Sequence, residues 1–103
     1  MLTQPIDEGM KQKQPKLQNK TSYIMASYIN ALSSAGARTV PLIFDNPNTQ
    51  IELDKIDKLN GVFYCGGDGG NEYLDFGRKV YHKVKDINDQ GNHLPAWGTC
   101  LGF

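Results

Sequence analysis

The sequence predicts an α/β fold in which a parallel sheet is flanked by helices. Apolar segments of strand length alternate with segments of helical periodicity, in the order strand, helix, strand, helix, strand, helix, strand. This alternation requires crossover connections, which join parallel strands in a right-handed sense. A chain of 103 residues is long enough for one domain with a modest core. We therefore predict that residues 1–103 belong to a single domain.

The composition narrows the classes of function. Lysines and arginines balance aspartates and glutamates, so the formal net charge is zero, which argues against a dedicated nucleic-acid-binding protein. No apolar run approaches the roughly 20 residues that span a bilayer, and the first residues lack the basic start and apolar centre of a secretory signal. Cys65 and Cys100 form no C-x-x-C pair, so we expect no metal site, and nothing in the sequence calls for a cofactor.

Four segments are predicted as strands. Residues 1–3 read as the end of a first strand, and residues 38–44 as a second, in which Pro41 indicates an edge position or an early bend. Residues 61–65 form a continuous apolar run, which is typical of a strand buried on both faces in a parallel sheet. Residues 94–97 are the fourth strand.

Three segments have helical periodicity. The first is capped by Thr21 or Ser22 and runs to about residue 35, where Gly36 is predicted to adopt a left-handed C-cap conformation. Thr49 and Glu52 match a T-x-x-E capping box that opens a short helix with Ile51, Ile56 and Leu59 on its apolar side. A third helix is predicted over residues 72–88, with Leu74, Phe76, Val80, Val84 and Ile87 as apolar positions and His82 on the solvated face.

The polar residues 7–20 are predicted to be a loop. A solvated surface connection and a rim over a binding pocket are both consistent with its length and composition.

The last residues of the chain carry the strongest chemical signal. Residues 98–102 read Gly-Thr-Cys-Leu-Gly, a G-x-C-x-G pattern that is the cysteine counterpart of the nucleophile elbow. Such an elbow lifts its central residue above the carboxyl end of a strand, and its glycines make room for neighbouring backbone. A buried structural cysteine between two turn glycines is the alternative interpretation of Cys100.

A second signal follows the third predicted strand. Residues 66–71 contain four glycines, which leave backbone N–H groups free to approach a ligand or an oxyanion, although a flexible turn would have the same composition. The carboxyl ends of parallel strands meet at one edge of a sheet, where ligands bind. The glycine turn and the elbow are therefore expected to converge. His93 precedes the fourth strand, at the end away from the elbow, so it is a poor candidate for the base of Cys100.

Three stretches resemble the gamma-glutamyl hydrolase family, a member of the class I glutamine-amidotransferase-like superfamily: SYIMASYINALSSAGARTVPL, LNGVFYCGGDGG and LPAWGTCLGF. The resemblance implies a flavodoxin-like sheet and Cys100 as a nucleophile that attacks γ-glutamyl amides. It implies an oxyanion hole formed by the N–H of Leu101 with an N–H from Gly66 or Gly67. It also implies that Tyr23 lies near the substrate.

The resemblance carries further expectations and two departures. Cys65 replaces the family's proline before the glycine pair, and the family's catalytic histidine and acidic partner lie beyond Phe103. We therefore expect a portion of the domain that is truncated after the elbow and inactive alone. The expected substrate is a small γ-glutamyl compound such as a folate poly-γ-glutamate. The expected location is lysosomal, vacuolar or secreted, and the expected state a homodimer or a subunit of a larger assembly.

Two other functions remain open at this stage. One is a catalytically inactive homologue that acts as a structural or binding subunit. The other is a glutamine amidotransferase domain. In either case, we expect Cys65 and Cys100 to remain free thiols, because the elbow lifts Cys100 above the sheet while Cys65 points into the helical layer.

Overall fold

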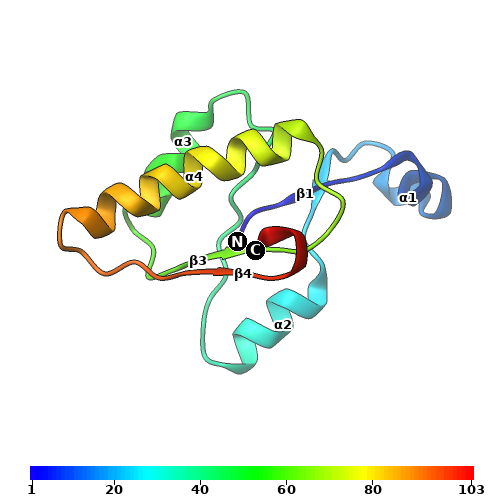
Figure 1. The fold of residues 1–103 in the computed structure, drawn as a ribbon. Helices are drawn as coiled ribbons and strands as arrows, with labels where there is room; N and C mark the ends of the chain where they lie inside the picture. The colour runs from blue at the N-terminus through cyan, green and yellow to red at the C-terminus, as the bar shows by residue number, and fades with distance from the viewer.

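The computed structural model describes all of residues 1–103 and shows an α/β domain with two small two-stranded sheets, β1–β2 and β3–β4 (Figure 1). Strand β3 (Val62–Tyr64) pairs in parallel with β4 (Ala96–Gly98). On the other side of β3, the N–H of Leu2 donates to the carbonyl of Phe63 at 3.1 Å, and Leu2 in turn forms a parallel bridge with Leu42. The predicted α/β class with parallel pairing is confirmed.

The segment around Leu42 lies at the edge of this arrangement. The Met1 amino group donates to the Val40 carbonyl at 2.9 Å, and the Leu42 N–H donates to the Met1 carbonyl at 2.8 Å. Regular strand geometry over the predicted residues 38–44 is reduced to the single bridge at Leu42. Pro41, which has no N–H to donate, therefore occupies the edge position that the sequence predicts.

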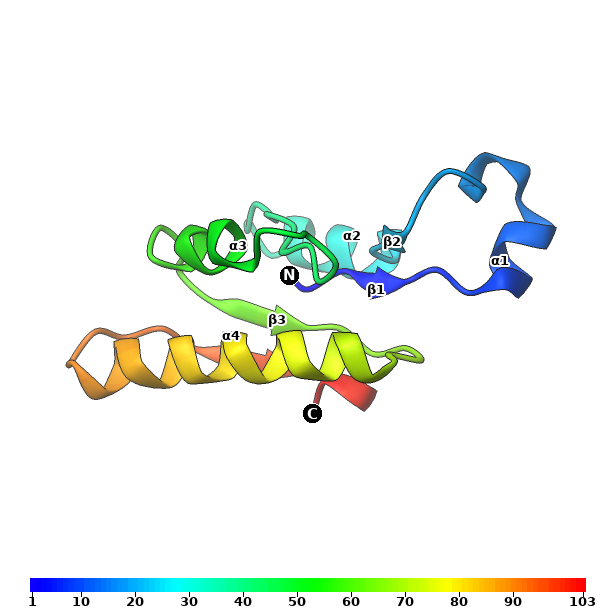
Figure 2. The same cartoon turned by 90° about the horizontal axis from the view of Figure 1, so that it is seen from above.

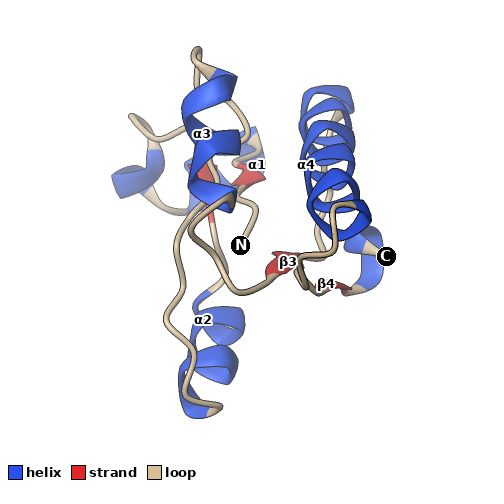
Figure 3. Ribbon diagram, turned by 90° about the vertical axis from the view of Figure 1, so that its left-hand side faces the viewer, coloured by secondary structure: helices blue, strands red, loops and turns tan.

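The helices form two unequal layers around the sheet. Helices α3 (Thr49–Ile56) and α4 (Asn71–Asp89) cover one face, and α2 (Ala26–Ser34) lies on the other (Figures 1 and 3). The hydrophobic core lies under α3 and α4 and consists of Leu2, Leu42, Ile56, Val62, Tyr73, Phe76, Val80, Val84 and Leu94. Helix α2 buries no residue completely. None of the helices is both long and apolar enough to cross a membrane.

Helix α4 matches the predicted segment to within one residue at each end, but its buried face differs slightly. Phe76, Val80 and Val84 are buried as expected, whereas Leu74 is exposed and the neighbouring Tyr73 takes its place in the core. Ile51 of α3 is likewise exposed. His82 is exposed, as predicted.

The first predicted helix, which corresponds to α2, begins later than expected. Ser22 and Tyr23 form β2, which pairs antiparallel with β1 (Gln4–Pro5), so that α2 begins only at Ala26. The predicted cap at Thr21 or Ser22 is therefore wrong, because these residues pair with a distant segment of backbone instead. The end of α2 is as predicted. Gly36 has a φ of 87° and its N–H donates to the Ser33 carbonyl at 3.0 Å.

The predicted loop over residues 7–20 contains two short helical segments. Helix α1 (Glu8–Lys13) is capped by Asp7, whose carboxylate accepts the N–H of Met10 at 2.8 Å, and the 3-10 turn η1 (Pro15–Leu17) follows. This segment extends away from the body of the molecule (Figure 2). The expectation of a loop is wrong over these two segments, and the N-terminal one is capped by Asp7.

The predicted capping box at the start of α3 does not form. Asn48, rather than Thr49, precedes the helix, and its side chain makes no capping hydrogen bond. Glu52 turns away from the helix terminus and is 1% exposed.

The buried Glu52 carboxylate instead joins α3 to the segment that precedes it. It accepts the N–H of Ile43 at 3.0 Å, the Asn46 amide at 2.6 Å and the Lys55 ammonium at 2.6 Å. Burial by itself raises the pKa of this carboxyl. The hydrogen bonds from Lys55, Ile43 and Asn46 outweigh that effect and hold the pKa below its usual value.

We predict that Glu52→Gln lowers the free energy of unfolding by about 1.5–3 kcal/mol at pH 7, because an amide cannot accept all three donors. Chemical unfolding in urea measures this loss. Asp54→Asn, at an exposed position of the same helix, is the matched control and should change stability by less than about 0.5 kcal/mol.

The decrease in the free energy of unfolding of Glu52→Gln should depend on pH. Since the pKa of Glu52 is lower in the folded state, the carboxylate stabilises the protein above its unfolded pKa of about 4.3, and this stabilisation is lost as the pH falls further. The difference between wild type and Glu52→Gln should therefore shrink below about pH 4. A difference that is constant from pH 7 to pH 3 would contradict this role for the carboxylate.

Candidate functional site

The candidate site lies where β3 and β4 end side by side. The N–H of Thr99 donates to the Tyr64 carbonyl at 3.1 Å, which continues the pairing beyond the strands. A Cβ added to Gly66 would lie 2.8 Å from the Cβ of Cys100. The glycine turn and the cysteine elbow therefore meet, as the sequence predicts.

The backbone at Cys100 has the geometry of a nucleophile elbow. Its φ is 55°, and it is the only residue other than glycine with a positive φ in the chain. A left-handed conformation costs a residue with a side chain about 1–2 kcal/mol, so the surrounding structure must impose it. Cys100 opens the 3-10 turn η2 (Cys100–Gly102), and its side chain is free and exposed.

The two flanking glycines are required by close backbone contacts. A Cβ on Gly98 would overlap the carbonyl of Gly102, and a Cβ on Gly102 would overlap the carbonyl of Tyr64. Neither position has room for any other residue. The backbone of the elbow is thus packed tightly, with Gly98 against Gly102 and Gly102 against the end of β3.

Three backbone N–H groups near Cys100 in the chain or in the glycine turn were predicted as oxyanion donors. Those of Gly67 and Leu101 donate to no protein oxygen, whereas the N–H of Gly66 donates to the Tyr28 hydroxyl at 3.2 Å. All three residues were candidates for an oxyanion hole. In this structure, the tyrosine hydroxyl occupies one of the three donors.

Tyr28 is therefore a residue of the site that the sequence did not identify. It lies in the first turn of α2, and its ring packs against Phe63 of β3 with 5.5 Å between ring centroids. Tyr23, the tyrosine that the resemblance selected, lies in β2 and lines a separate cavity with Gly67. The sequence signal that distinguishes the two is weak, because both tyrosines fit an aromatic face of a helix.

The two cysteines differ sharply in environment. Cys65 is 1% exposed, and burial raises the pKa of its thiol to about 11. Its carbonyl accepts the Gln4 amide at 3.0 Å and the Tyr73 hydroxyl at 3.2 Å. Both thiols are free, as predicted. Cys65 is thus a structural core residue, and Cys100 is the accessible thiol.

The histidines lie away from the thiol. His93 precedes β4, whereas Cys100 follows it, and His82 is exposed on α4. No hydrogen bond joins Cys100 to an acidic or basic side chain. The 103 residues therefore supply the candidate nucleophile without a base.

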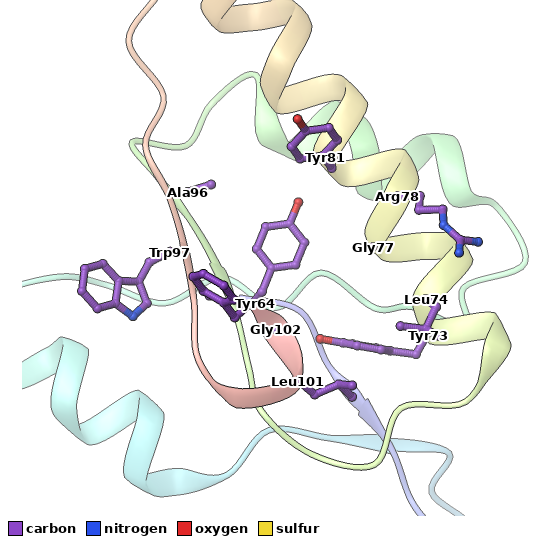
Figure 4. A pocket seen from close by; sticks show the side chains of 12 residues that line it. Tyr64, Tyr73, Leu74, Gly77, Arg78, Tyr81, Ala96, Trp97, Leu101 and Gly102 are labelled. Atoms are coloured by element: carbon purple, nitrogen blue, oxygen red, sulfur yellow. The ribbon is translucent and has the colours of Figure 1, made fainter.

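A groove of about 450 Å³ lies beside the elbow, between α4 and β4 (Figure 4). Its lining is rich in aromatic side chains: Tyr64, Tyr73, Tyr81, Trp97 and Phe103. Trp97 is 67% exposed, and its indole N–H donates to the Thr99 hydroxyl at 3.2 Å. Cys100 does not line this groove, so the groove is not the predicted substrate pocket.

Comparisons with known proteins identify a consistent set of relatives. The chain is 38% identical over 91 residues to gamma-glutamyl hydrolase 1 of Arabidopsis thaliana, an alignment that covers 85% of this chain and 26% of the relative. It is 39% identical over 89 residues to the gamma-glutamyl hydrolase of Homo sapiens, covering 79% of this chain and 26% of the relative. It is 35% identical to gamma-glutamyl hydrolase B of Dictyostelium discoideum, covering all of this chain and 29% of the relative.

These relatives confirm the resemblance that the sequence predicts, over about a quarter of their length. No family model matches the chain.

We predict that iodoacetamide at pH 8 modifies Cys100 about a hundredfold or more faster than Cys65, because only about 0.1% of a thiol with a pKa of 11 is ionised there. Peptide mass spectrometry over time measures both rates. Cys100→Ala should remove the fast phase and Cys65→Ala should retain it. Equal rates in the native protein would contradict the elbow assignment.

We predict that Gly102→Ala lowers the free energy of unfolding by about 1–3 kcal/mol or more and displaces the elbow, since its Cβ would overlap the Tyr64 carbonyl. Gly70→Ala is the control, because a Cβ added there would have no atom within 4 Å and the φ of Gly70 is −80°. Thermal unfolding and the rate of Cys100 alkylation report the two effects. The idea fails if both variants unfold alike.

Proposed function

We propose that these residues are the nucleophile-bearing part of a gamma-glutamyl hydrolase, which cleaves γ-glutamyl amide bonds through a cysteine. The observation that carries the proposal is the strained, exposed Cys100 in contact with the glycine turn at Gly66. The names of the relatives support hydrolysis rather than amidotransfer. Because the chain spans about a quarter of these relatives, the activity of the whole protein remains a proposal.

The proposed reaction is acyl transfer to the Cys100 sulfur. The thiolate attacks the carbonyl carbon of the γ-glutamyl amide, a C–S bond forms, and the carbonyl oxygen becomes an oxyanion. Collapse of this intermediate expels the amine with a proton, and water then hydrolyses the thioester to release glutamate and regenerate the thiol. In this proposal the N–H groups of Leu101 and Gly67 bind the oxyanion. One such donor is worth about 2.7–4 kcal/mol in the transition state.

The third candidate donor is the N–H of Gly66, which is hydrogen-bonded to Tyr28. Its hydroxyl accepts the Gly66 N–H, so this N–H becomes available only if the hydroxyl moves away or is replaced by a substrate oxygen. In this proposal, a substrate oxygen would accept the N–H that the Tyr28 hydroxyl accepts in this structure.

The order of four neighbouring segments, which are the segments around Leu2 and Leu42 with β3 and β4, supports the finer fold assignment. Numbered along the chain, they lie side by side as second, first, third and fourth, which matches the beginning of the flavodoxin-like order. Ligands in such folds bind outside the carboxyl ends of the strands, where Gly66 and Cys100 lie. We therefore propose a class I glutamine-amidotransferase-like fold for the domain of which these residues form a part.

The proposal further requires a general base from outside these residues. Neither His82 nor His93 lies near the sulfur, so the base comes from a further segment of the enzyme or from a partner. The experiment that tests the proposal should therefore use a reaction of Cys100 that proceeds without a general base.

A chloroketone analogue of glutamine, in which –CO–CH₂Cl replaces the amide, meets this requirement. The Cys100 thiolate displaces chloride, a C–S bond forms, and no proton must be delivered to a leaving amine. We expect a single adduct on Cys100 that forms about tenfold or more faster than with chloroacetone at equal concentration. Mass spectrometry of the intact protein and its peptides measures the rate.

Two controls decide the outcome. Cys100→Ala should give no adduct, and excess L-glutamine should slow the reaction of the wild-type protein. Equal rates for the two chloroketones would show that the site does not recognise a γ-glutamyl group.

A further inference from the structure

The hydroxyl of Tyr28 and the side chain of Cys100 lie against the same residue of the glycine turn. A Cβ added to Gly66 would lie 2.8 Å from the Cβ of Cys100 and 3.0 Å from the hydroxyl oxygen of Tyr28. Both atoms are therefore within 3.0 Å of one point. The phenol of Tyr28 is thus a direct neighbour of the candidate nucleophile, although the two residues come from α2 and from the end of the chain.

The Tyr28 hydroxyl acts in this structure only as an acceptor. The N–H of Gly66 donates to it at 3.2 Å, and no hydrogen bond within the protein uses the proton of the hydroxyl itself. A hydroxyl can accept and donate at the same time. Its proton is therefore available to a group that approaches Cys100.

The position of the phenol is set by the strand that leads into the glycine turn. Tyr28 lies in the first turn of α2, and its ring packs against Phe63 of β3 with 5.5 Å between ring centroids and 54° between ring planes. The side chain is half-buried. The ring is thus held beside Gly66 by Phe63, while its partial exposure leaves the hydroxyl room to turn.

The reaction proposed above creates a negative charge beside this hydroxyl. No acidic or basic side chain is hydrogen-bonded to Cys100, so the donors available to an oxyanion are neutral. A hydrogen bond from a hydroxyl to an ionised oxygen is short, about 2.5–2.7 Å, and roughly twice as strong as one between neutral groups. The Tyr28 hydroxyl has the chemistry and the place to supply such a bond.

We propose that Tyr28 is a further catalytic residue, whose hydroxyl donates a hydrogen bond to the oxyanion that forms on the γ-carbonyl group. The inference rests on the proposed function, because this oxyanion forms only if Cys100 attacks that carbonyl. As the C–S bond forms, the π electrons of the carbonyl move to its oxygen, which takes the N–H of Gly66. The hydroxyl, released from this N–H, turns its own proton toward the oxygen and keeps it. When the intermediate collapses, the hydroxyl returns to Gly66.

A donor and a simple cap on the Gly66 N–H predict opposite effects of the same substitution. If the hydroxyl only occupied this N–H, its removal would free a backbone donor and strengthen the binding of an oxyanion. If the hydroxyl donates, its removal weakens that binding. Tyr28→Phe removes the hydroxyl and retains the ring that packs against Phe63, so it separates the two roles.

The test uses 5-oxopentanoate, an aldehyde with the carbon skeleton of glutamate, labelled with ¹³C at the aldehyde carbon. The Cys100 sulfur adds to this carbon, a C–S bond forms, and the thiol proton passes to the oxygen. The hemithioacetal has a tetrahedral carbon and no leaving group. Carbon nuclear magnetic resonance titration of the 103-residue chain measures its dissociation constant. We expect Tyr28→Phe to raise this constant about tenfold or more.

Two controls accompany this measurement. Tyr81→Phe removes a hydroxyl from a tyrosine that is 54% exposed on α4, and the dissociation constant should remain within about twofold of the wild-type value. Cys100→Ala should give no hemithioacetal signal.

A second reaction separates a role in the chemistry from a role in the structure. Iodoacetamide alkylates Cys100 by displacement of iodide from a saturated carbon, so no oxyanion forms. Its rate in Tyr28→Phe should remain within about twofold of the wild-type rate. A substitution that merely displaced the elbow would change the alkylation rate and the aldehyde affinity together.

Three results would each overturn the inference: no hemithioacetal on Cys100 of the wild-type protein, an equal or higher aldehyde affinity in Tyr28→Phe, or a parallel loss of alkylation rate and affinity. The proposed function is measured separately, by the two chloroketones on the wild-type protein. Equal chloroketone rates would remove the recognition of a γ-glutamyl group, whereas an unchanged aldehyde affinity in Tyr28→Phe would remove only the role of the hydroxyl.

Discussion

The parallel pairing of β3 with β4 is the constraint on which the site depends. Both strands end at the same edge, and the hydrogen bond from the Thr99 N–H to the Tyr64 carbonyl carries the pairing into the elbow. The backbone of Gly102 then folds back onto the same carbonyl, too closely for a side chain. Backbone contacts rather than side-chain contacts thus hold Cys100 at a positive φ. The thiol itself is free and exposed.

The parts of the fold that follow from local pattern could be predicted. The apolar run that becomes β3, the long amphipathic α4 and the C-cap at Gly36 each have a signature within a few residues. The pairing of β2 with β1 could not, because two polar dipeptides become strands only through a distant partner. The T-x-x-E pattern at Glu52 is the same whether the carboxylate caps its own helix or, as here, accepts the Ile43 N–H.

The candidate site also has one part that the sequence predicts and another that it does not. The motif around Cys100 and the glycine turn at Gly66 are contiguous in sequence, and the rule that parallel strands end at one edge brings them together. The hydroxyl of Tyr28 reaches the Gly66 N–H across 38 positions of the chain, and helical periodicity explains that tyrosine equally well as a packing residue. The cavity that Tyr23 and Gly67 line draws Asp7 and Glu72 from distant parts of the chain. No pattern within one segment reports such a juxtaposition.

Trp97 gives the elbow an optical property of its own. It is the only tryptophan of the chain, it lies in β4 three residues before Cys100, and its indole is mostly exposed while bonded to the Thr99 hydroxyl. Indole emission shifts with the polarity around the ring, and the tryptophan emission of these 103 residues comes from one position next to the thiol. A rearrangement of the elbow, or a group that covers it, therefore changes the tryptophan emission, and no other indole in these 103 residues masks the change.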